Sequence, residues 1–180
     1  MKDGGGPLSD DLPMERKPAC ILRSAEILAR RTAYSQRLNP RSHFASTHLT
    51  MHAGFARVGI SLAWLPPGKD SFAYHAHRFA EEWIFILSGR AIAEVDGQDL
   101  EVGPGDFLGF PTPSVAHLLK NRSDAEVVYL MGGERLYPRP DVVDYPHLGK
   151  TFLLLPGEGP TAFHELGEPI HPFGPASDDE

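Results

Sequence analysis

The chain has 180 residues, which is enough for one domain with additional tails and for a hydrophobic core that needs no disulfide. Hydrophobic residues make up 41% of the chain and charged residues 23%, which is typical of a globular protein. The net charge of −7 argues against nucleic acid and anionic membranes as partners, because both attract a surplus of Lys and Arg. A single cysteine, Cys20, excludes an intrachain disulfide, and there is neither an apolar signal core nor a run of about 18–20 apolar residues. We therefore expect a cytoplasmic protein.

Gly and Pro set the two ends of the chain apart from its middle. Residues 1–20 combine several Gly and Pro with charged residues, which predicts a flexible N-terminal tail. Residues 157–180 are also rich in Pro and Gly, and we expect a C-terminal tail there. The prediction is thus a single domain over residues 21–156, with its core at 55–131 and an N-terminal extension before the core.

One short helix is predicted in the N-terminal extension, over Ser24–Arg31. Ser24 can act as its N-cap, Ile27 and Leu28 give it an apolar side, and basic residues occupy its last turn. We expect this helix to pack on the strands that follow.

From Phe55 onward the pattern is that of β-strands. Apolar and polar residues alternate with a period of two, and Gly, Pro and Asp separate the runs, with Asp96-Gly97 as a strong hairpin signal. Many short strands at close spacing predict an all-β antiparallel sandwich or barrel. The expected strands are 58–64, 72–77, 82–87, 90–95, 98–102, 107–110, 117–121, 126–131 and 151–155.

A histidine pair followed by a carboxylate stands out within this β region. His75 and His77 are two residues apart on a predicted strand, so both side chains point to the same face, where two imidazoles can clamp a metal ion. Glu82 opens the next strand and shares a face with Ile84 and Ile86. Strand parity favours Glu82 over its neighbour Glu81 as the carboxylate that joins the two histidines.

A second block of the chain supplies His117, which shares a strand face with Leu119 and Asn121. Three imidazoles and one carboxylate form a mixed nitrogen and oxygen site for one divalent transition metal. Zn, Fe, Mn and Ni suit such a set, as do Co and Cu, and the residue types do not choose among them. Four protein ligands leave one or two positions of a six-coordinate metal open for substrate, dioxygen or water.

These two blocks resemble the two motifs of the cupin superfamily, G-x5-H-x-H-x3,4-E-x6-G and G-x5-P-x-G-x2-H-x3-N. The first motif is matched with one extra residue before the histidines, and the second has Pro113 in place of its Gly and one extra residue before His117. The loop from Pro111 to His117 is therefore where this chain departs from the pattern. The matching residues are Gly68, His75, His77, Glu82, Gly89, Gly105, Pro111, His117 and Asn121.

The resemblance covers roughly residues 55–131 and implies a cupin double-stranded β-helix, that is, a jelly-roll barrel, of the small single-domain bacterial type. It also implies that His75, His77, Glu82 and His117 bind the metal, and that the protein forms a homodimer. We predict a metal-dependent enzyme that acts on a small organic molecule by dioxygenase, isomerase or lyase chemistry. The alternative is a non-catalytic cupin that binds or senses a small molecule or a metal.

The remaining candidates have simpler interpretations. The histidines at 43, 48 and 52 are expected on the surface or at an interface, and those at 147, 164 and 171 are expected to face solvent. Trp64 is expected to pack in the core with Leu62, and Asp106 to be a turn residue. Arg57 is expected to be solvated, although it could reach a substrate carboxylate at the barrel mouth. No catalytic residue is assigned from the sequence.

Overall fold

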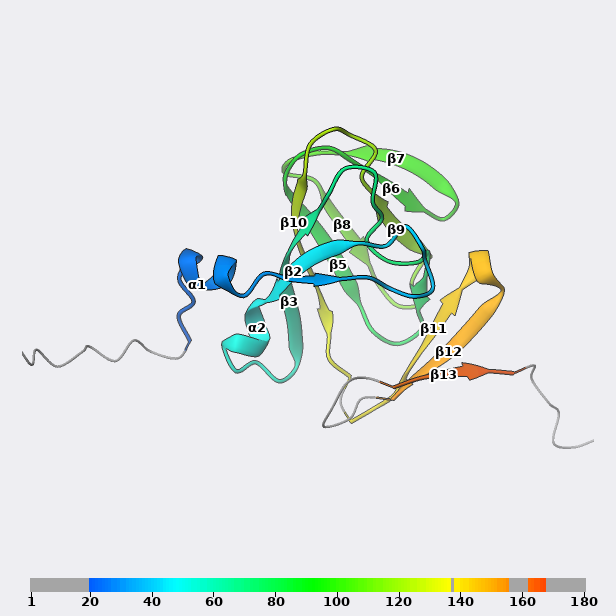
Figure 1. The fold of residues 1–180 in the computed structure, drawn as a ribbon. Coiled ribbons are helices and arrows are strands. Elements are labelled where there is room, and N and C mark those ends of the chain that lie inside the picture. Colours follow the sequence, from blue (N-terminus) through cyan, green and yellow to red (C-terminus); the bar gives the residue numbers. More distant parts are fainter. Residues whose placement is uncertain (1–19, 137, 156–161, 168–180) are drawn as a thin grey trace, which may run out of the picture.

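The computed structural model describes residues 20–136, 138–155 and 162–167. Strands account for most of this part of the chain (Figure 1). None of the helices in the described ranges is long and apolar enough to cross a membrane. The elements are α1 (Ser24–Ala29), β1 (Thr32–Tyr34), β2 (Phe44–His48), α2 (Leu49–His52), β3 (Val58–Leu65), β4 (Ala76–His77), β5 (Glu82–Ser88), β6 (Ala91–Val95), β7 (Gln98–Val102), β8 (Phe107–Phe110), β9 (His117–Lys120), β10 (Val127–Glu134), β11 (Asp141–Tyr145), the 3-10 turn η1 (Pro146–Leu148), β12 (Lys150–Leu155) and β13 (Ala162–Leu166).

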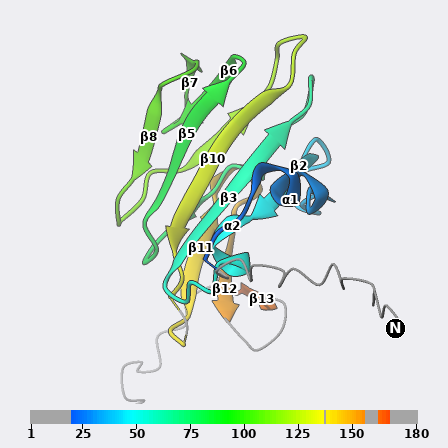
Figure 2. The ribbon, with the colours of Figure 1, turned by 90° about the vertical axis from the view of Figure 1, so that its left-hand side faces the viewer.

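Antiparallel pairing joins these strands into three sheets. The largest has the order β1-β2-β3-β10-β5-β8, and Figure 2 shows it face on. A second sheet has the order β7-β6-β9, and a third the order β13-β12-β11-β4. Strands that are distant in sequence lie side by side, such as β3 and β10, so the sheets close over a common interior as in a jelly-roll barrel. The predicted all-β barrel with a short N-terminal helix is confirmed.

The barrel interior is filled from alternate residues of the large sheet. Ala63 and Leu65 of β3, Ile86 of β5 and Tyr129 of β10 are fully buried there. These side chains meet Ala93 and Leu119 from the smaller β7-β6-β9 sheet. The two sheets thus pack face to face, which removes the apolar side of each from water.

Trp64 is buried, as expected, but on the outer face of β3 and not in the cluster that fills the barrel interior. Strand residues alternate between faces, so Trp64 and Leu62 point to the outer face when Ala63 points inward. The guanidinium of Arg31 lies over this ring, 4.7 Å from its centre. The segment around α1 covers this part of the sheet, as Figure 2 shows.

Local turn chemistry fixes two of the connections. Asp96 and Gly97 both have positive φ, 49° and 73°, which is the conformation of a type I′ hairpin between β6 and β7. Gly89 has φ 82°, and a Cβ at this position would lie 2.8 Å from the carbonyl oxygen of Glu126. Only glycine fits there, because both the backbone angle and the close approach of β10 exclude a side chain.

The third sheet extends beyond the predicted core. Strands β11, β12 and β13 attach to the barrel through β4, where Val143 pairs with His77 and Asp144 with Ala76. Val143, Tyr145 and Phe152 form a small hydrophobic cluster with Ala73 of the barrel. Strand β13 lies within residues 157–180; the rest of that segment and nearly all of residues 1–20 fall outside the described ranges.

Two predicted elements differ in detail from the structure. The helix starts at Ser24 itself, with Arg23 as N-cap, because the Glu26 carboxylate accepts the backbone N–H of Arg23 at 2.8 Å. The expected strand at 72–77 is regular only over Ala76–His77. His75 still pairs with His117 through an isolated bridge, so the two histidines two residues apart keep their common direction.

Candidate metal centre

Three imidazole side chains converge on one carboxylate oxygen, which belongs to Glu82. The Nε2 atoms of His75, His77 and His117 lie 3.5, 3.4 and 3.3 Å from Oε2 of Glu82. His75, His77 and Glu82 also offer ligand atoms that all lie within 4.8 Å of one another, which is a grouping that can hold a metal ion. His117 meets the group through Glu82, and its ring centre lies 4.6 Å from that of His75.

The four residues come from separate segments that the fold brings together. His77 ends β4, Glu82 begins β5 and His117 begins β9, while His75 forms a bridge to His117. The position of the His117 ring is fixed by Phe110, whose ring lies parallel to it with centres 3.6 Å apart. The loop that precedes His117, where the sequence departs from the cupin motif, contains a cis peptide bond between Thr112 and Pro113.

Hydrogen bonds on the far side of each imidazole determine which ring nitrogen faces Glu82. Nδ1 of His75 contacts the carbonyl of Ala73 at 2.8 Å, and Nδ1 of His117 contacts that of Val115 at 3.2 Å. Carbonyl oxygens only accept hydrogen bonds, so each Nδ1 must carry the proton. Nε2 is therefore the nitrogen of each ring that faces Glu82 and that a metal ion could bind.

His77 is held in the same way by Asp141, whose Oδ2 lies 2.6 Å from Nδ1 of His77. The result is three imidazole Nε2 atoms and a carboxylate oxygen gathered around one small volume. Such a set repels itself unless a cation or a proton lies between its members. The donor atoms therefore suit a divalent transition metal.

Burial and neighbouring charges act on the ionisation of these groups. Burial disfavours the charged form of Glu82, but contacts with His117 and His75 hold the pKa of Glu82 well below its usual value. Burial also lowers the pKa of His117, which favours the neutral ring. For His77, burial works in the same direction but Asp141 and Glu82 outweigh it and raise the pKa. A metal ion would thus find Glu82 ionised and His117 neutral, and it would compete with a proton at His77.

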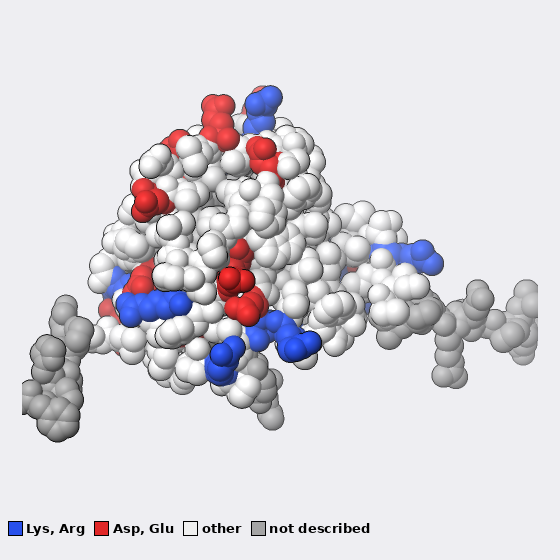
Figure 3. All heavy atoms as spheres, turned by 180° about the vertical axis from the view of Figure 1, so that it is seen from behind, with Lys and Arg blue, Asp and Glu red and all other residues white. Residues whose placement is uncertain are grey.

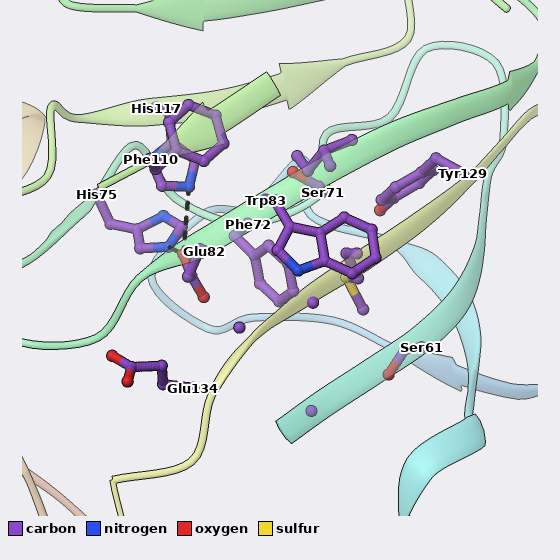
Figure 4. A pocket seen from close by; sticks show the side chains of 15 residues that line it. Ser61, Ser71, Phe72, His75, Glu82, Trp83, Phe110, His117, Tyr129 and Glu134 are labelled. Carbon is purple, nitrogen blue, oxygen red and sulfur yellow. Dashed lines mark ion pairs between the residues drawn. The ribbon is translucent and has the colours of Figure 1, made fainter. Parts of the chain in front are cut away.

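A cavity of about 250 Å³ opens beside three of the four residues, His75, Glu82 and His117. Figure 4 shows these side chains at one end of the cavity, Tyr129 at the other and Trp83 between them. The hydroxyl of Tyr129 points toward the middle of the lining side chains and has no hydrogen-bond partner, although Tyr129 is fully buried. The lining residues are Gly59, Ser61, Ser71, Phe72, His75, Glu82, Trp83, Ile84, Phe110, His117, Tyr129, Met131, Gly132, Gly133 and Glu134.

Several groups near the site were not found by sequence reasoning. Asp141 and Tyr129 come from strands without a distinctive motif, so only their position in the fold reveals them. His48 was expected on the surface but is half-buried, and its Nδ1 contacts Oγ of the cavity residue Ser61 at 2.9 Å. Period-two spacing along β2 places His48 on the same face as buried Phe44, which was the signal available.

The other sequence candidates lie outside the cavity. Glu81 is exposed, in agreement with the preference for Glu82. Asp106 is a turn residue as predicted, because its carboxylate accepts the backbone N–H of Gly103 at 2.7 Å. Arg57 is exposed. His171 falls outside the described residues.

Charges on the molecular surface are mixed. In the view from behind (Figure 3), Lys and Arg side chains lie next to Asp and Glu side chains, and neither sign forms a continuous patch on that face. Much of the remaining surface in this view is uncharged.

Comparisons with known proteins agree with this fold. The family model of the cupin domain matches residues 61–133, the segment that contains all four converging residues. No curated protein matches the chain. A crystal structure from Thermotoga maritima, of a predicted oxalate decarboxylase, shares the fold at 24% identity with a TM-score of 0.53, over 64% of this chain and 99% of the other.

Two solved structures are more similar over most of their length. One is a protein from Acidithiobacillus ferrooxidans assigned as a sugar phosphate isomerase, 32% identical, with a TM-score of 0.75 over 82% of this chain and 92% of the other. The second is a sugar phosphate isomerase of the cupin superfamily from Silicibacter pomeroyi, 26% identical, with a TM-score of 0.66 over 79% of this chain and 90% of the other. On the barrel topology, the matched domain and these relatives, the chain belongs to the cupin superfamily.

Proposed function

We propose that His75, His77, Glu82 and His117 bind one divalent transition metal and that the protein is a metal-dependent isomerase of a small hydroxylated carbonyl compound. The observation that carries the metal assignment is the convergence of three imidazole Nε2 atoms on Glu82, with each Nδ1 already committed to another acceptor. When bound, the metal would supply a positive charge that polarises a substrate carbonyl.

Isomerase chemistry is preferred over dioxygenase and lyase chemistry for two reasons. The two relatives that align over about four-fifths of the chain are both described as sugar phosphate isomerases. The cavity is also smaller than the roughly 300–1,000 Å³ clefts that hold drug-sized ligands, and hydroxyl groups of Ser61 and Tyr129 line it. A compact substrate with several hydroxyl groups suits this lining.

Glu134 is the proposed proton carrier. An aldose–ketose isomerisation moves a proton between two neighbouring carbons, which requires a base beside the carbonyl. Glu82 and Glu134 are the two carboxylates among the cavity's lining residues, and Glu82 is committed to the metal in this proposal. Figure 4 shows Glu134 at the edge of the cavity, on the side of Glu82. Oε2 of Glu134 accepts the backbone N–H of Glu81 at 3.2 Å, which restricts its side chain.

A phosphate group would lie at the edge of the cavity, since no Lys or Arg is among its lining residues. Two arginines lie next to that edge: Arg135 follows the lining residue Glu134, and its N–H donates to the carbonyl of Arg57 at 2.8 Å. We propose that this pair binds the phosphate of a phosphorylated substrate. Replacing both arginines by alanine should then raise the KM for a sugar phosphate and leave the KM for the matching free sugar unchanged.

Turnover of aldose and ketose phosphates by the metal-loaded protein tests the proposal. Proton exchange with solvent deuterium at the carbon next to the carbonyl, followed by NMR, detects the reaction without a coupled assay. E134Q should lower kcat about 100-fold or more while the metal content stays at that of the wild type. Sugar binding without turnover would instead identify a non-catalytic binding protein, and turnover that persists after metal removal would contradict the metal-dependent reaction.

We also propose a homodimer, in which a second copy covers the outer face of the large sheet. Leu62, Leu130, Phe85 and Phe107 are neighbours on successive strands of this face, and Phe107 is 64% exposed. No described helix lies over β5, β8 and β10, as Figure 2 shows. F107E should shift the mass measured by analytical ultracentrifugation from dimer to monomer. A wild type that is monomeric at micromolar concentration would contradict the proposal.

A further inference from the structure

A buried carboxylate outside the matched cupin domain contacts one of the proposed metal ligands. Asp141 begins β11, beyond residues 61–133, and only 6% of it is exposed. Its Oδ2 accepts the Nδ1 proton of His77 at 2.6 Å. A strand beyond the matched domain therefore contacts the candidate metal centre directly.

The orientation of Asp141 is itself fixed by the backbone. Its Oδ1 accepts the N–H of Phe79 at 3.1 Å and the N–H of Val142 at 2.8 Å. With Oδ1 held by two donors, Oδ2 is left to face His77. An ionised carboxylate can only accept hydrogen bonds, so it locks the proton of His77 on Nδ1 and turns the lone pair of Nε2 toward Glu82.

The same strand contacts a second proposed ligand. Tyr145 is 2% exposed, and its ring lies nearly parallel to that of His75, with centres 6.0 Å apart. Its hydroxyl is positioned by Nε2 of Gln36 at 3.3 Å. Alternate residues of β11, from Asp141 to Tyr145, thus form one wall behind the histidines, and β11 is paired directly with β4, which carries His77.

We infer that the C-terminal hairpin β11–β12 is part of the metal centre, with Asp141 as a positioning residue for His77, so that metal binding and docking of this hairpin stabilise each other. The inference rests on the proposed metal site but not on the proposed isomerase reaction. If docking of the hairpin raises the metal affinity, bound metal must stabilise the docked hairpin by the same factor. The hydrogen bond from His77 to Asp141 is the contact through which the experiment tests this coupling.

Asp144 provides a matched control on the same strand. Its carboxylate accepts two hydrogen bonds from the guanidinium of Arg78, at 2.7 and 2.8 Å, and one from the hydroxyl of Thr151 at 2.6 Å. Loss of this charge disturbs β11 and β12 without removing a contact to any of the four proposed ligands. D144N therefore shows how much the Zn²⁺ affinity falls when the hairpin is weakened but Asp141 is kept.

The experiment measures Zn²⁺ affinity by competition with a chromophoric chelator for the wild type, D141N and D144N. D141N should bind Zn²⁺ about 10–100-fold more weakly, the usual effect of losing a carboxylate behind a ligating histidine, and D144N should bind as the wild type does. The absorption spectrum of the Co²⁺-loaded protein should change in D141N and not in D144N, because only the first loses the orientation of a ligand. Equal affinity in D141N and the wild type would overturn the inference.

Amide hydrogen exchange of the wild type provides a second measurement, which does not require that any variant folds. Zn²⁺ should slow amide exchange in residues 141–155 as well as around the histidines. Exchange in 141–155 that is unchanged by bound Zn²⁺ would contradict the coupling while leaving the metal site intact. A wild type that binds no metal would contradict the proposed site and this inference together.

Discussion

The backbones of His75 and His117 bond to each other in both directions. The N–H of His117 donates to the carbonyl of His75 at 2.8 Å, and the N–H of His75 donates to that of His117 at 3.2 Å. This reciprocal pair joins the two histidine-bearing segments and places both imidazoles on one side of the bridge. The relative placement of these two proposed ligands is therefore set by backbone pairing.

The first prediction concerns the metal itself. Protein purified without a chelator should contain about one transition metal ion per chain, and H75A/H77A should contain none, because two of the four proposed ligands are lost. Inductively coupled plasma mass spectrometry measures both. H52A, at an exposed histidine of α2, is the control and should keep the wild-type content. Full metal content in the double variant would contradict the assignment of His75 and His77 as metal ligands.

A second prediction separates the two neighbouring glutamates. E82Q should weaken Zn²⁺ binding at least 10-fold, since an amide oxygen replaces the charged ligand on which the three imidazoles converge. E81Q should leave the affinity unchanged, because Glu81 is exposed. Isothermal titration calorimetry of both variants decides the matter, and the opposite ranking would assign the site to Glu81.

The third prediction follows from the unpartnered hydroxyl of Tyr129. A buried hydroxyl without a hydrogen bond opposes folding, so Y129F should leave the free energy of unfolding of the metal-free protein unchanged or raise it by about 1 kcal/mol. Y145F is the contrasting variant, because Tyr145 bonds to Gln36 and its loss should cost about 0.5–1.5 kcal/mol. Urea unfolding measures both values. A Y129F variant less stable than Y145F would mean that the hydroxyl of Tyr129 has a partner.

Two glycines with positive φ should respond differently to alanine. At Gly97 the space around a Cβ is open, so G97A should cost only the strain of the backbone angle, about 1–2 kcal/mol. At Gly89 the same strain is joined by contacts of 2.8 Å with Glu126 O and 2.9 Å with Val127 Cα. G89A should therefore be clearly less stable than G97A. Equal midpoints in thermal unfolding would show that β10 moves aside at no cost.

A fifth prediction concerns pH. Burial raises the pKa of Glu94, but Lys120, at 2.9 Å, and His147, at 2.7 Å, outweigh burial and lower it below the usual value. At a pH between the folded and the unfolded pKa of Glu94, the unfolded chain binds more protons than the folded one. The stabilisation of the fold by ionised Glu94 is therefore complete above the unfolded pKa. It is lost as the pH falls through the lower pKa of the folded state.

The difference in unfolding free energy between the wild type and E94Q should accordingly shrink as the pH falls below about 4.5. Urea unfolding of the chelator-treated protein from pH 7 to pH 3 measures this difference. A difference that is constant with pH would exclude an ionic role for Glu94.

Several features could be read from the residues alone. The alternation of Glu82, Ile84 and Ile86 placed these side chains on one face, and they do lie toward the barrel interior. Asp96-Gly97 predicted its hairpin because the required φ angles are available at low cost to these residue types. The four proposed ligands were all indicated by spacing, and the fold brings them together; that they bind a metal stays a proposal.

Tertiary structure decided what spacing leaves open. Alternation along β3 defines two faces but does not say which face lines the barrel interior. In the structure Ala63 and Leu65 lie in the interior, and Trp64 lies on the outer face. Asp141 has no local signal, because its role depends on the pairing of β11 with β4. The unpartnered hydroxyl of Tyr129 likewise results from the surroundings of one side chain. The spacing of apolar residues and the residue types are local properties that can be read from the sequence. Burial and long-range hydrogen bonds depend on segments that meet only in the folded barrel.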